Sequence, residues 1–326
     1  MMVLYFFILL TGFVGLIKGA DFFVDGSSGI ANYFNVPGLI IGLTVVAFGT
    51  SMPELAVSTF AAVCGSNEIA LSNVLGSNIF NLLMVIGCCA LISPVPAEKA
   101  VLIRDFPVSI AAVILLFLST GSISIFAYKK TLTDMNSLVG RVDRIHGIVL
   151  VVSFIIYIAF LIIKAKENET DNNDSNESIS IKKCLLFIIS GLIMIIAGGQ
   201  AVVFSAQSIA RMFGMTETLI GLTIVAVGTS LPELVTSIVA ARKKETDLAI
   251  GNAIGSNIFN VMFILGISSL LNPVDINAAS AYDMLILIFS SIFVLTFLII
   301  SGKLKRGHGL AMIALYISDL VYAVLR

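Results

Sequence analysis

The sequence predicts an all-α integral membrane protein with ten transmembrane helices arranged as two inverted five-helix repeats. Three observations lead to this fold. Of the 326 residues, 58% are hydrophobic and 12% are charged, whereas soluble domains average roughly 45–50% and 25%. Ten apolar runs are long enough to cross a bilayer. Finally, one stretch of the first half recurs in the second half.

A spanning helix needs about 20 mostly apolar residues. We expect such helices at residues 2–24, 37–63, 69–92, 101–121, 145–163, 183–205, 218–242, 247–271, 282–300 and 307–325. The first run lacks a basic n-region and is too long for a cleaved signal peptide, so it is interpreted as a helix of the mature protein. An even number of spans places both termini on the same side.

The chain divides into a first five-helix repeat at 1–163, a linker at 164–182 and a second five-helix repeat at 183–326. The linker is polar, Asn-rich and free of aromatic residues, so it cannot bury a core and is expected to be flexible. With the N-terminus outside, 12 of the 19 Lys and Arg residues fall in inner loops, 6 fall outside and 1 lies within a span. The bias of Lys and Arg toward cytoplasmic loops therefore predicts external termini and a cytoplasmic linker.

The internal repeat appears when the chain is aligned with itself at an offset of 179. Residues 36–95 match residues 215–274 without a gap, with 27 identities in 60 positions. "IGLTVVAFGTSMPEL" matches "IGLTIVAVGTSLPEL", and "NVLGSNIFN" matches "NAIGSNIFN". Because each half has an odd number of spans, the second half enters the membrane from the opposite face. Inverted repeats of this kind are typical of secondary transporters.

Each repeat carries one carboxylate deep in a predicted span, Glu54 in the first and Glu233 in the second. A charge at the middle of a membrane costs about 2.5–3.5 kcal/mol or more, so such a residue is a functional candidate by default. A purely structural ion pair is the alternative, but no Lys or Arg stands at a comparable depth in either repeat core.

The neighbours of the two glutamates suit a cation site. Pro53 and Pro232 remove the backbone donors that would bond the Gly49 and Gly228 carbonyls, and glycine makes a local helix break easier. Helical spacing places hydroxyl groups on the same face as each carboxylate. These hydroxyls belong to Thr50, Ser51, Thr229 and Ser230.

A second polar stripe runs along the following span of each repeat, with residues spaced by four: Asn73, Ser77 and Asn81, then Asn252, Ser256 and Asn260. Interhelical hydrogen bonding alone would explain small polar residues here, above all Asn73 and Asn252. Carboxylate, hydroxyl, amide and carbonyl oxygens together suit Ca²⁺, Na⁺ or Mg²⁺, and not zinc or copper. Two carboxylates neutralise one Ca²⁺ or two monovalent ions, so the two kinds of cation would compete for one site.

These motifs resemble the calcium/cation antiporter superfamily in its sodium/calcium exchanger branch of prokaryotic type. The resemblance rests on "GTSMPE" and "GTSLPE", each followed by "GSNIFN", and it extends over nearly the whole chain. It implies an antiporter with alternating access in which Glu54 and Glu233 are the central Ca²⁺ ligands. It also implies further cation ligands in the hydroxyls of Thr50, Ser51, Ser77, Thr229, Ser230 and Ser256, the carbonyls of Ala47 and Ala226, and Asn81 and Asn260 at the middle of the site.

Two alternatives remain at this point. The same glutamates could couple Ca²⁺, or another divalent cation, to H⁺, although proton-coupled relatives usually carry glutamates where this chain has Ser and Asn. A passive cation channel is the alternative from another class. We expect no cofactor and no enzymatic activity, because the spans hold no intramembrane His, no paired Asp and no nucleophile–base set. We expect no nucleic-acid partner, since the net charge is −1. The expected partners are inorganic cations and membrane lipid, and the expected form is a monomer in the plasma membrane.

Overall fold

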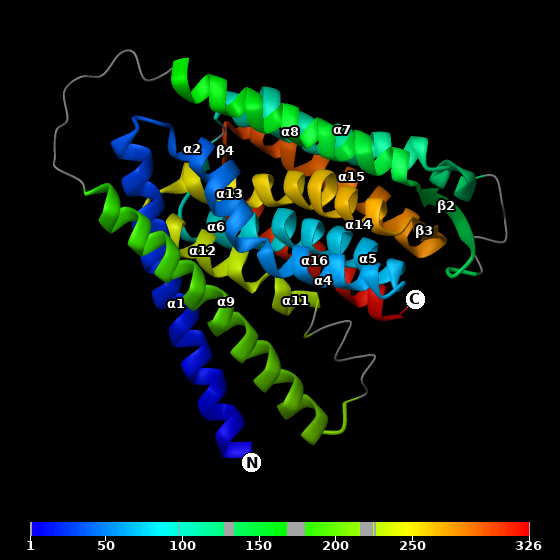
Figure 1. The fold of residues 1–326 in the computed structure, drawn as a ribbon, viewed down its shortest axis with the longest axis horizontal. Helices are drawn as coiled ribbons and strands as arrows, with labels where there is room; N and C mark the ends of the chain where they lie inside the picture. Colours follow the sequence, from blue (N-terminus) through cyan, green and yellow to red (C-terminus); the bar gives the residue numbers. More distant parts are fainter. Residues whose placement is uncertain are drawn as a thin grey trace.

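The computed structural model describes residues 2–96, 98–126, 134–167, 180–215, 224 and 226–325. Nearly all regular structure in this part of the chain is helical (Figure 1). Eight described helices are long and apolar enough to cross a membrane, and a ninth candidate span is a pair, Gly38–Thr50 and Met52–Val63, bent by 50°. The first residues of the predicted span 218–242 lie outside the described residues, and so does most of the predicted linker 164–182.

The first half contains the following elements, in chain order. They are α1 (Met2–Tyr33), α2 (Gly38–Ile41), the π-helical η1 (Gly42–Val46), α3 (Ala47–Thr50), α4 (Met52–Val63), α5 (Asn67–Ile79), the π-helical η2 (Phe80–Val85), α6 (Ile86–Ile92), β1 (Val95–Pro96), η3 (Val101–Asp105), α7 (Phe106–Ser119), η4 (Ser122–Phe126), β2 (Leu138–Val142) and α8 (Arg144–Glu167).

The second half repeats much of this order. It contains α9 (Ile181–Met212), α11 (Ala226–Thr229), α12 (Leu231–Arg242), α13 (Thr246–Ile258), the π-helical η8 (Phe259–Ile264), α14 (Leu265–Leu271), β3 (Val274–Asn277), α15 (Ala278–Ser301), β4 (Lys303–Leu304) and α16 (Arg306–Leu325). The pairs α1 and α9, α3 and α11, α4 and α12, α5 and α13, and α6 and α14 begin and end at residues 179 apart. The offset of the sequence repeat is thus also the offset of the helices.

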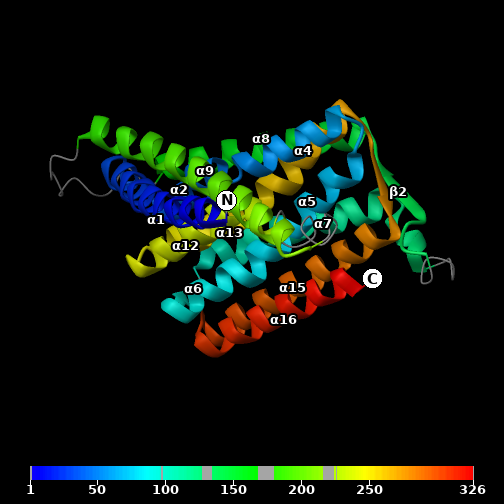
Figure 2. The same cartoon turned by 90° about the horizontal axis from the view of Figure 1, so that it is seen from below.

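Helices α1 and α9 pack against each other along much of their length and lie together beside the other helices (Figures 1 and 2). Glycines permit the close approach: a Cβ atom at Gly191 would lie 2.7 Å from the Gly19 carbonyl, and one at Gly198 would lie 2.7 Å from the Gly12 carbonyl. Such distances exclude any side chain, so these two helices meet backbone to backbone.

Both of these helices are longer than their apolar runs predict. Helix α1 continues past residue 24 to Tyr33, and α9 continues past residue 205 to Met212. In α1 the polar residues near the end of the run keep helical hydrogen bonds, and one of them pairs with a basic residue: the Asp25 carboxylate lies 2.7 Å from the Lys243 ammonium, just after α12. The length of an apolar run therefore predicts how much of a helix faces lipid, and the helix itself can continue beyond that run.

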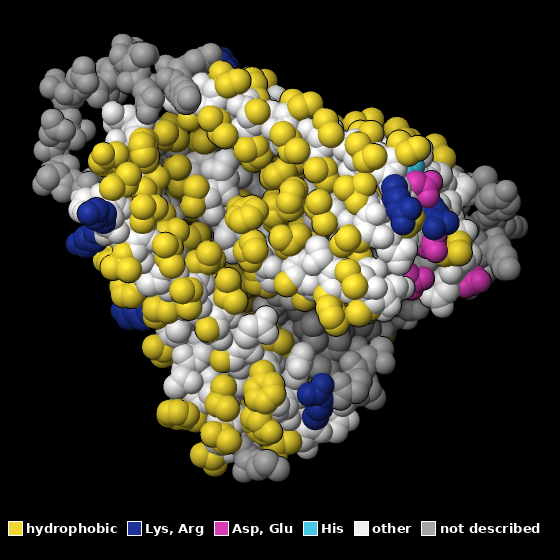
Figure 3. Space-filling view, in the orientation of Figure 1, with side chains coloured by type: hydrophobic (Ala, Val, Ile, Leu, Met, Phe, Trp, Pro, Cys, Tyr) yellow, Lys and Arg dark blue, Asp and Glu magenta, His cyan; other side chains and the backbone are white. Residues whose placement is uncertain are grey.

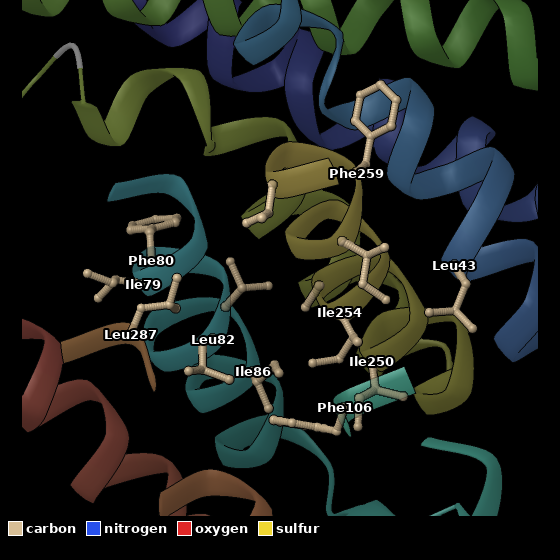
Figure 4. Packing of buried hydrophobic residues seen from close by; sticks show 14 of the residues in the cluster. Leu43, Ile79, Phe80, Leu82, Ile86, Phe106, Ile250, Ile254, Phe259 and Leu287 are labelled. Carbon is tan, nitrogen blue, oxygen red and sulfur yellow. The ribbon is translucent and has the colours of Figure 1, made fainter. Parts of the chain in front are cut away.

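A packed apolar core lies between the two repeats. Figure 4 shows Leu82 and Ile86, from η2 and α6, on one side of this layer, and Ile250 and Ile254 of α13 on the other. All four side chains are at most 2% exposed. Many residues on the outer faces of the helices are large, hydrophobic and exposed. Figure 3 shows hydrophobic side chains across the middle of one face and most charged side chains near its two ends, the distribution expected of a protein surrounded by lipid.

The described part of the chain contains four short strands, which the sequence did not predict, in the segments that connect helices. β1 pairs with β4, and β2 pairs with β3, both antiparallel. Each pair joins a segment of the first half to one of the second half, so the two halves are tied together at the helix ends. The backbone groups of these segments lie beyond the apolar spans and find partners in each other.

Glu98, just before the span that begins at Val101, gives one prediction about pH. Burial, together with the neighbouring charge and hydrogen bond of Asp247, raises the pKa of its carboxyl to about 7. The folded protein therefore holds this proton more tightly than the unfolded chain does. The stability that the proton contributes is fully present below the unfolded value of 4.5 and is lost as pH rises through about 7.

Glu98→Gln should therefore raise the melting temperature at pH 8 and leave it nearly unchanged at pH 4.5. Thermal unfolding of the purified protein followed by circular dichroism measures both values. Glu68→Gln, at an exposed glutamate in the first turn of α5, serves as the control. An equal shift at the two pH values would contradict the interpretation.

Candidate ion-binding site

The two glutamates stand just after breaks in their helices. Ser51 separates α3 from α4 with backbone angles φ −84° and ψ 9°, and Ser230 separates α11 from α12 with φ −91° and ψ 7°. Pro53 and Pro232 then occupy the first turn of the following helix, where a missing N–H is tolerated. Each break thus places a glutamate in the first turn of a helix, inside the protein.

Glycines beside the breaks let the α1 and α9 pair come close. A Cβ atom at Gly49 would lie 2.9 Å from the Phe23 ring of α1, and one at Gly228 would clash with the Val203 side chain of α9. The sequence interpretation gave these glycines only a part in breaking the helix. Their further function is to leave room for a neighbouring helix.

Both carboxylates are completely buried, at 0% exposure. Each is bound by a serine of the other repeat: Ser230 donates to Glu54 Oε1 at 3.0 Å, and Ser51 donates to Glu233 Oε1 at 2.8 Å. From helical spacing alone, each serine was expected beside the glutamate of its own repeat. The helix breaks redirect them, because the spacing rule holds only within a continuous helix.

Ser77 also approaches the Glu54 carboxylate, in addition to Ser230 and Thr229. Its hydroxyl lies 3.5 Å from Glu54 Oε1 and 3.0 Å from the hydroxyl of Ser230. The repeat-related Ser256 is fully buried, and its Oγ has no hydrogen-bond partner among the described residues. The two halves of the site are therefore similar in composition but not identical in hydrogen bonding.

Several buried oxygen atoms of the site lack partners within the described part of the chain. They are Oε2 of Glu54, Oε2 of Glu233, Oδ1 of Asn81, Oδ1 of Asn260 and Oγ of Ser256. None of the ion pairs found there involves either glutamate. A buried charge without partner or hydrogen bonds is costly, by several kcal/mol. Free acceptors around two unpaired carboxylates are what a cation requires.

The asparagines of the second stripe link the helices around the glutamates. Asn252 Oδ1 accepts from Thr50 at 3.0 Å, and Asn73 Oδ1 accepts from Thr229 at 3.5 Å. The amide nitrogens of the same asparagines lie 3.4 Å from the backbone carbonyls of Glu233 and Glu54, respectively. Asn73 and Asn252 thus link the helices that carry them to the broken helices of both repeats.

Asn78 and Asn257 were missed by the sequence interpretation, although both lie inside the "GSN" motifs. Each donates its amide to the backbone carbonyl of the other, at 3.1 Å in both directions. Asn78 Oδ1 also accepts from Asn260 Nδ2 at 3.1 Å. The two motifs of the repeat therefore meet each other in the buried interior. The identity of both asparagines at the repeat offset was the available signal.

The two predicted backbone ligands are less clearly placed. The Ala47 carbonyl accepts from the backbone N–H of Ser51 at 3.1 Å and lies 3.4 Å from the hydroxyl of Thr50. Ala226 is the first residue of α11. No cluster of three or more His, Cys, Asp or Glu residues that could hold a metal occurs among the described residues. The site instead combines two carboxylates with neutral oxygens.

The fold and this site define a class: a polytopic membrane protein with a buried, oxygen-lined anionic site between two similar halves. A family model described as "Sodium/calcium exchanger protein" matches residues 4–163 and 183–325. The chain belongs to this family, and it is a cation antiporter of the prokaryotic exchanger type.

Individual relatives support the membership of the chain in this family. The sodium/calcium exchanger MaX1 of Methanosarcina acetivorans is 33% identical over 352 residues, covering 98% of this chain and 99% of MaX1. The putative antiporter CaxA of Alkalimonas amylolytica is 37% identical and covers 91% of each chain. A solved structure of the sodium-calcium exchanger NCX_Mj, soaked with Na⁺ and Sr²⁺, superimposes with a TM-score of 0.81 at 32% identity, over 98% of this chain and 99% of that one.

Proposed function

We propose that this chain exchanges Na⁺ for Ca²⁺ by alternating access, with the two cations competing for Glu54 and Glu233. The observation that most directly supports this proposal is the pair of fully buried carboxylates, each with one oxygen free of hydrogen bonds in the described structure. Two negative charges balance one Ca²⁺ or two Na⁺. An empty site would retain both charges, which opposes its movement through an apolar barrier. Binding of either cation removes that obstacle, so one ion leaves only when the other enters.

The remaining ligands in this proposal are neutral oxygens. They are the hydroxyls of Thr50, Ser51, Ser77, Thr229, Ser230 and Ser256, the amides of Asn81 and Asn260, and the carbonyls of Ala47 and Ala226. Hard oxygen donors in this number suit Ca²⁺ and Na⁺. The assignment of Na⁺ and Ca²⁺ is supported by the names of the relatives MaX1 and NCX_Mj.

The proposed architecture has ten spans in two five-helix repeats of opposite orientation, at 1–163 and 183–326. The common offset of the described helix pairs supports it. We place both termini outside the plasma membrane and the linker 164–182 in the cytoplasm, from the distribution of Lys and Arg. The protein would work as a monomer, without a cofactor, because each site residue comes from one chain.

The test uses purified protein in sealed liposomes loaded with Na⁺ and diluted into Na⁺-free buffer that contains labelled Ca²⁺. We expect Ca²⁺ uptake that requires the Na⁺ gradient and does not occur with a pH gradient alone. Uptake driven only by the pH gradient would assign H⁺ as the coupling ion. Uptake that needs neither gradient, and that follows Ca²⁺ alone, would indicate a channel.

A further inference from the structure

Two serines that no sequence pattern singled out lie behind the asparagines of the site. Ser237 is fully buried on α12, and its Oγ accepts from Asn252 Nδ2 at 2.9 Å. Ser58 is fully buried on α4, and its Oγ accepts from Asn73 Nδ2 at 2.9 Å. The two serines are 179 residues apart, so each repeat contains the same contact.

Two contacts together hold the Asn252 amide in one direction. Its nitrogen lies 2.9 Å from the hydroxyl oxygen of Ser237 and 3.4 Å from the backbone carbonyl of Glu233. A backbone carbonyl accepts and never donates, so the amide nitrogen belongs on this side. The Ser237 hydroxyl could donate as well as accept, and here it adds the shorter of the two contacts to that nitrogen. The amide oxygen must then point the other way, across the repeat boundary, to the hydroxyl of Thr50 at 3.0 Å.

The direction of the amide in turn determines what Thr50 can offer a cation. A hydroxyl has one proton and two lone pairs. Here the proton of Thr50 can go to Asn252 Oδ1 at 3.0 Å, to the Val46 carbonyl at 3.1 Å, to the Ala47 carbonyl at 3.4 Å or to the Glu233 carboxylate. All four are acceptors, so none of them uses a lone pair of the hydroxyl. A reversed amide would donate its N–H to Thr50, occupy one lone pair and place a positive dipole at the site.

The first repeat has the same arrangement with a longer last step. Asn73 donates to Ser58 and to the Glu54 carbonyl, and its oxygen faces Thr229 at 3.5 Å. We call each serine–asparagine–threonine series of contacts a relay. In each relay, a serine and an asparagine of one half are linked to the threonine of the other half. The distance from Asn252 Oδ1 to Thr50 is shorter than the distance from Asn73 Oδ1 to Thr229, so the relay that starts at Ser237 is the stronger one.

We propose that Ser237 is a positioning residue that holds the Asn252 amide in this direction and so keeps an amide N–H donor away from the Thr50 oxygen, a ligand of the transported cation. This inference rests on the proposed function, because it assigns Thr50 as a cation ligand. Ser237 does not touch the cation. It acts through Asn252, by excluding a hydrogen-bond donor from the ligand oxygen.

Ser237→Ala tests the proposal, with Ca²⁺ uptake measured in Na⁺-loaded liposomes over a range of Ca²⁺ concentrations. The half-saturating Ca²⁺ concentration should rise about five- to tenfold, the factor expected for one buried hydrogen bond, with a maximal rate within about twofold of wild type. Ser237→Thr retains the hydroxyl and should restore the wild-type value. The control is Ser291→Ala, at a buried serine that bonds a carbonyl of its own helix.

A change in maximal rate with an unchanged half-saturating concentration would overturn the proposal, as would a Ser237→Ala variant that behaves like Ser291→Ala. A second comparison tests the route through Thr50. In a Thr50→Val background the hydroxyl is gone, so Ser237→Ala should add little. Full additivity of the two changes would show that Ser237 acts elsewhere.

Binding measured without transport separates this inference from the proposed function. Purified wild-type protein and Ser237→Ala are heated with increasing CaCl₂ or NaCl, and the rise in melting temperature reports binding to the folded state. A weaker Ca²⁺ response in Ser237→Ala supports the relay even if the liposomes show no Na⁺-driven exchange. A wild-type protein that responds to neither cation overturns both proposals, because no cation would then need the threonine oxygens.

Discussion

Glu54→Gln and Glu233→Gln are each expected to abolish cation exchange while the protein still folds and inserts. Glutamine has nearly the shape of glutamate and can still accept from the serine that binds each carboxylate, Ser230 or Ser51. The variant loses one of only two negative charges available to balance Ca²⁺. Removing one partner of a buried charge interaction costs about 3–5 kcal/mol, so Ca²⁺ uptake in Na⁺-loaded liposomes should fall at least about 100-fold.

Thermal unfolding separates lost binding from lost folding in these variants. Without added cations, each variant should be at least as stable as wild type, because the fold no longer holds two unpaired carboxylates. With added Ca²⁺, only the wild-type melting temperature should rise. Glu68→Gln, at an exposed glutamate on α5, is the matched control and should keep full uptake. Substantial Ca²⁺ uptake in both glutamine variants would contradict the assigned site.

Asn78→Ala should cause the second large effect, and it should act on stability as well as on transport. The substitution removes the donor to the Asn257 carbonyl and the acceptor for Asn260 Nδ2, both at 3.1 Å in a fully buried position. Each buried polar group left without a partner costs about 1–3 kcal/mol. We expect a clear fall in melting temperature and at least about tenfold slower Ca²⁺ uptake.

The measurement for Asn78→Ala pairs circular dichroism during heating with the liposome assay. Asn32→Ala, at an exposed asparagine near the end of α1, controls for loss of an amide at the surface. Asn257→Ala should be milder, because it removes only the donor to the Asn78 carbonyl. Wild-type stability in Asn78→Ala would show that the central asparagine contact does not hold the repeats together.

The carboxylates of the site could be identified from the sequence because a charge inside an apolar run is costly and does not help the helix to pack in lipid. Glu54 and Glu233 needed no structure to be noticed, and the repeat placed them at matching positions. The reach of Ser51 and Ser230 across to the opposite repeat could not be predicted. It depends on how two broken helices face each other, and spacing along one helix contains no information about its neighbour.

The asparagines and serines behind the site illustrate a second limit. Asn78, Asn257, Ser58 and Ser237 are small polar residues on helices, and any of them could simply bond a neighbouring helix. Only contacts between helices distinguish a residue that joins the repeats from one that orients a ligand. The lengths of α1 and α9 were underestimated for a different reason, since apolar runs stop at the lipid boundary while helical hydrogen bonds continue.

The crossed hydrogen bonds of the two glutamates make the halves of this chain mutually dependent. The serine that binds the Glu54 carboxylate lies in the second half, and the serine that binds Glu233 lies in the first. In a half expressed alone, Glu54 would keep only the longer contact with Ser77 at 3.5 Å, and Glu233 would lose the hydrogen bond from Ser51. If the gene were divided between α8 and α9, two polypeptides would have to assemble in one membrane before either contained a complete coordination shell. The smallest working unit is thus a pair of halves, and the covalent connection between them serves to keep that pair at one-to-one stoichiometry.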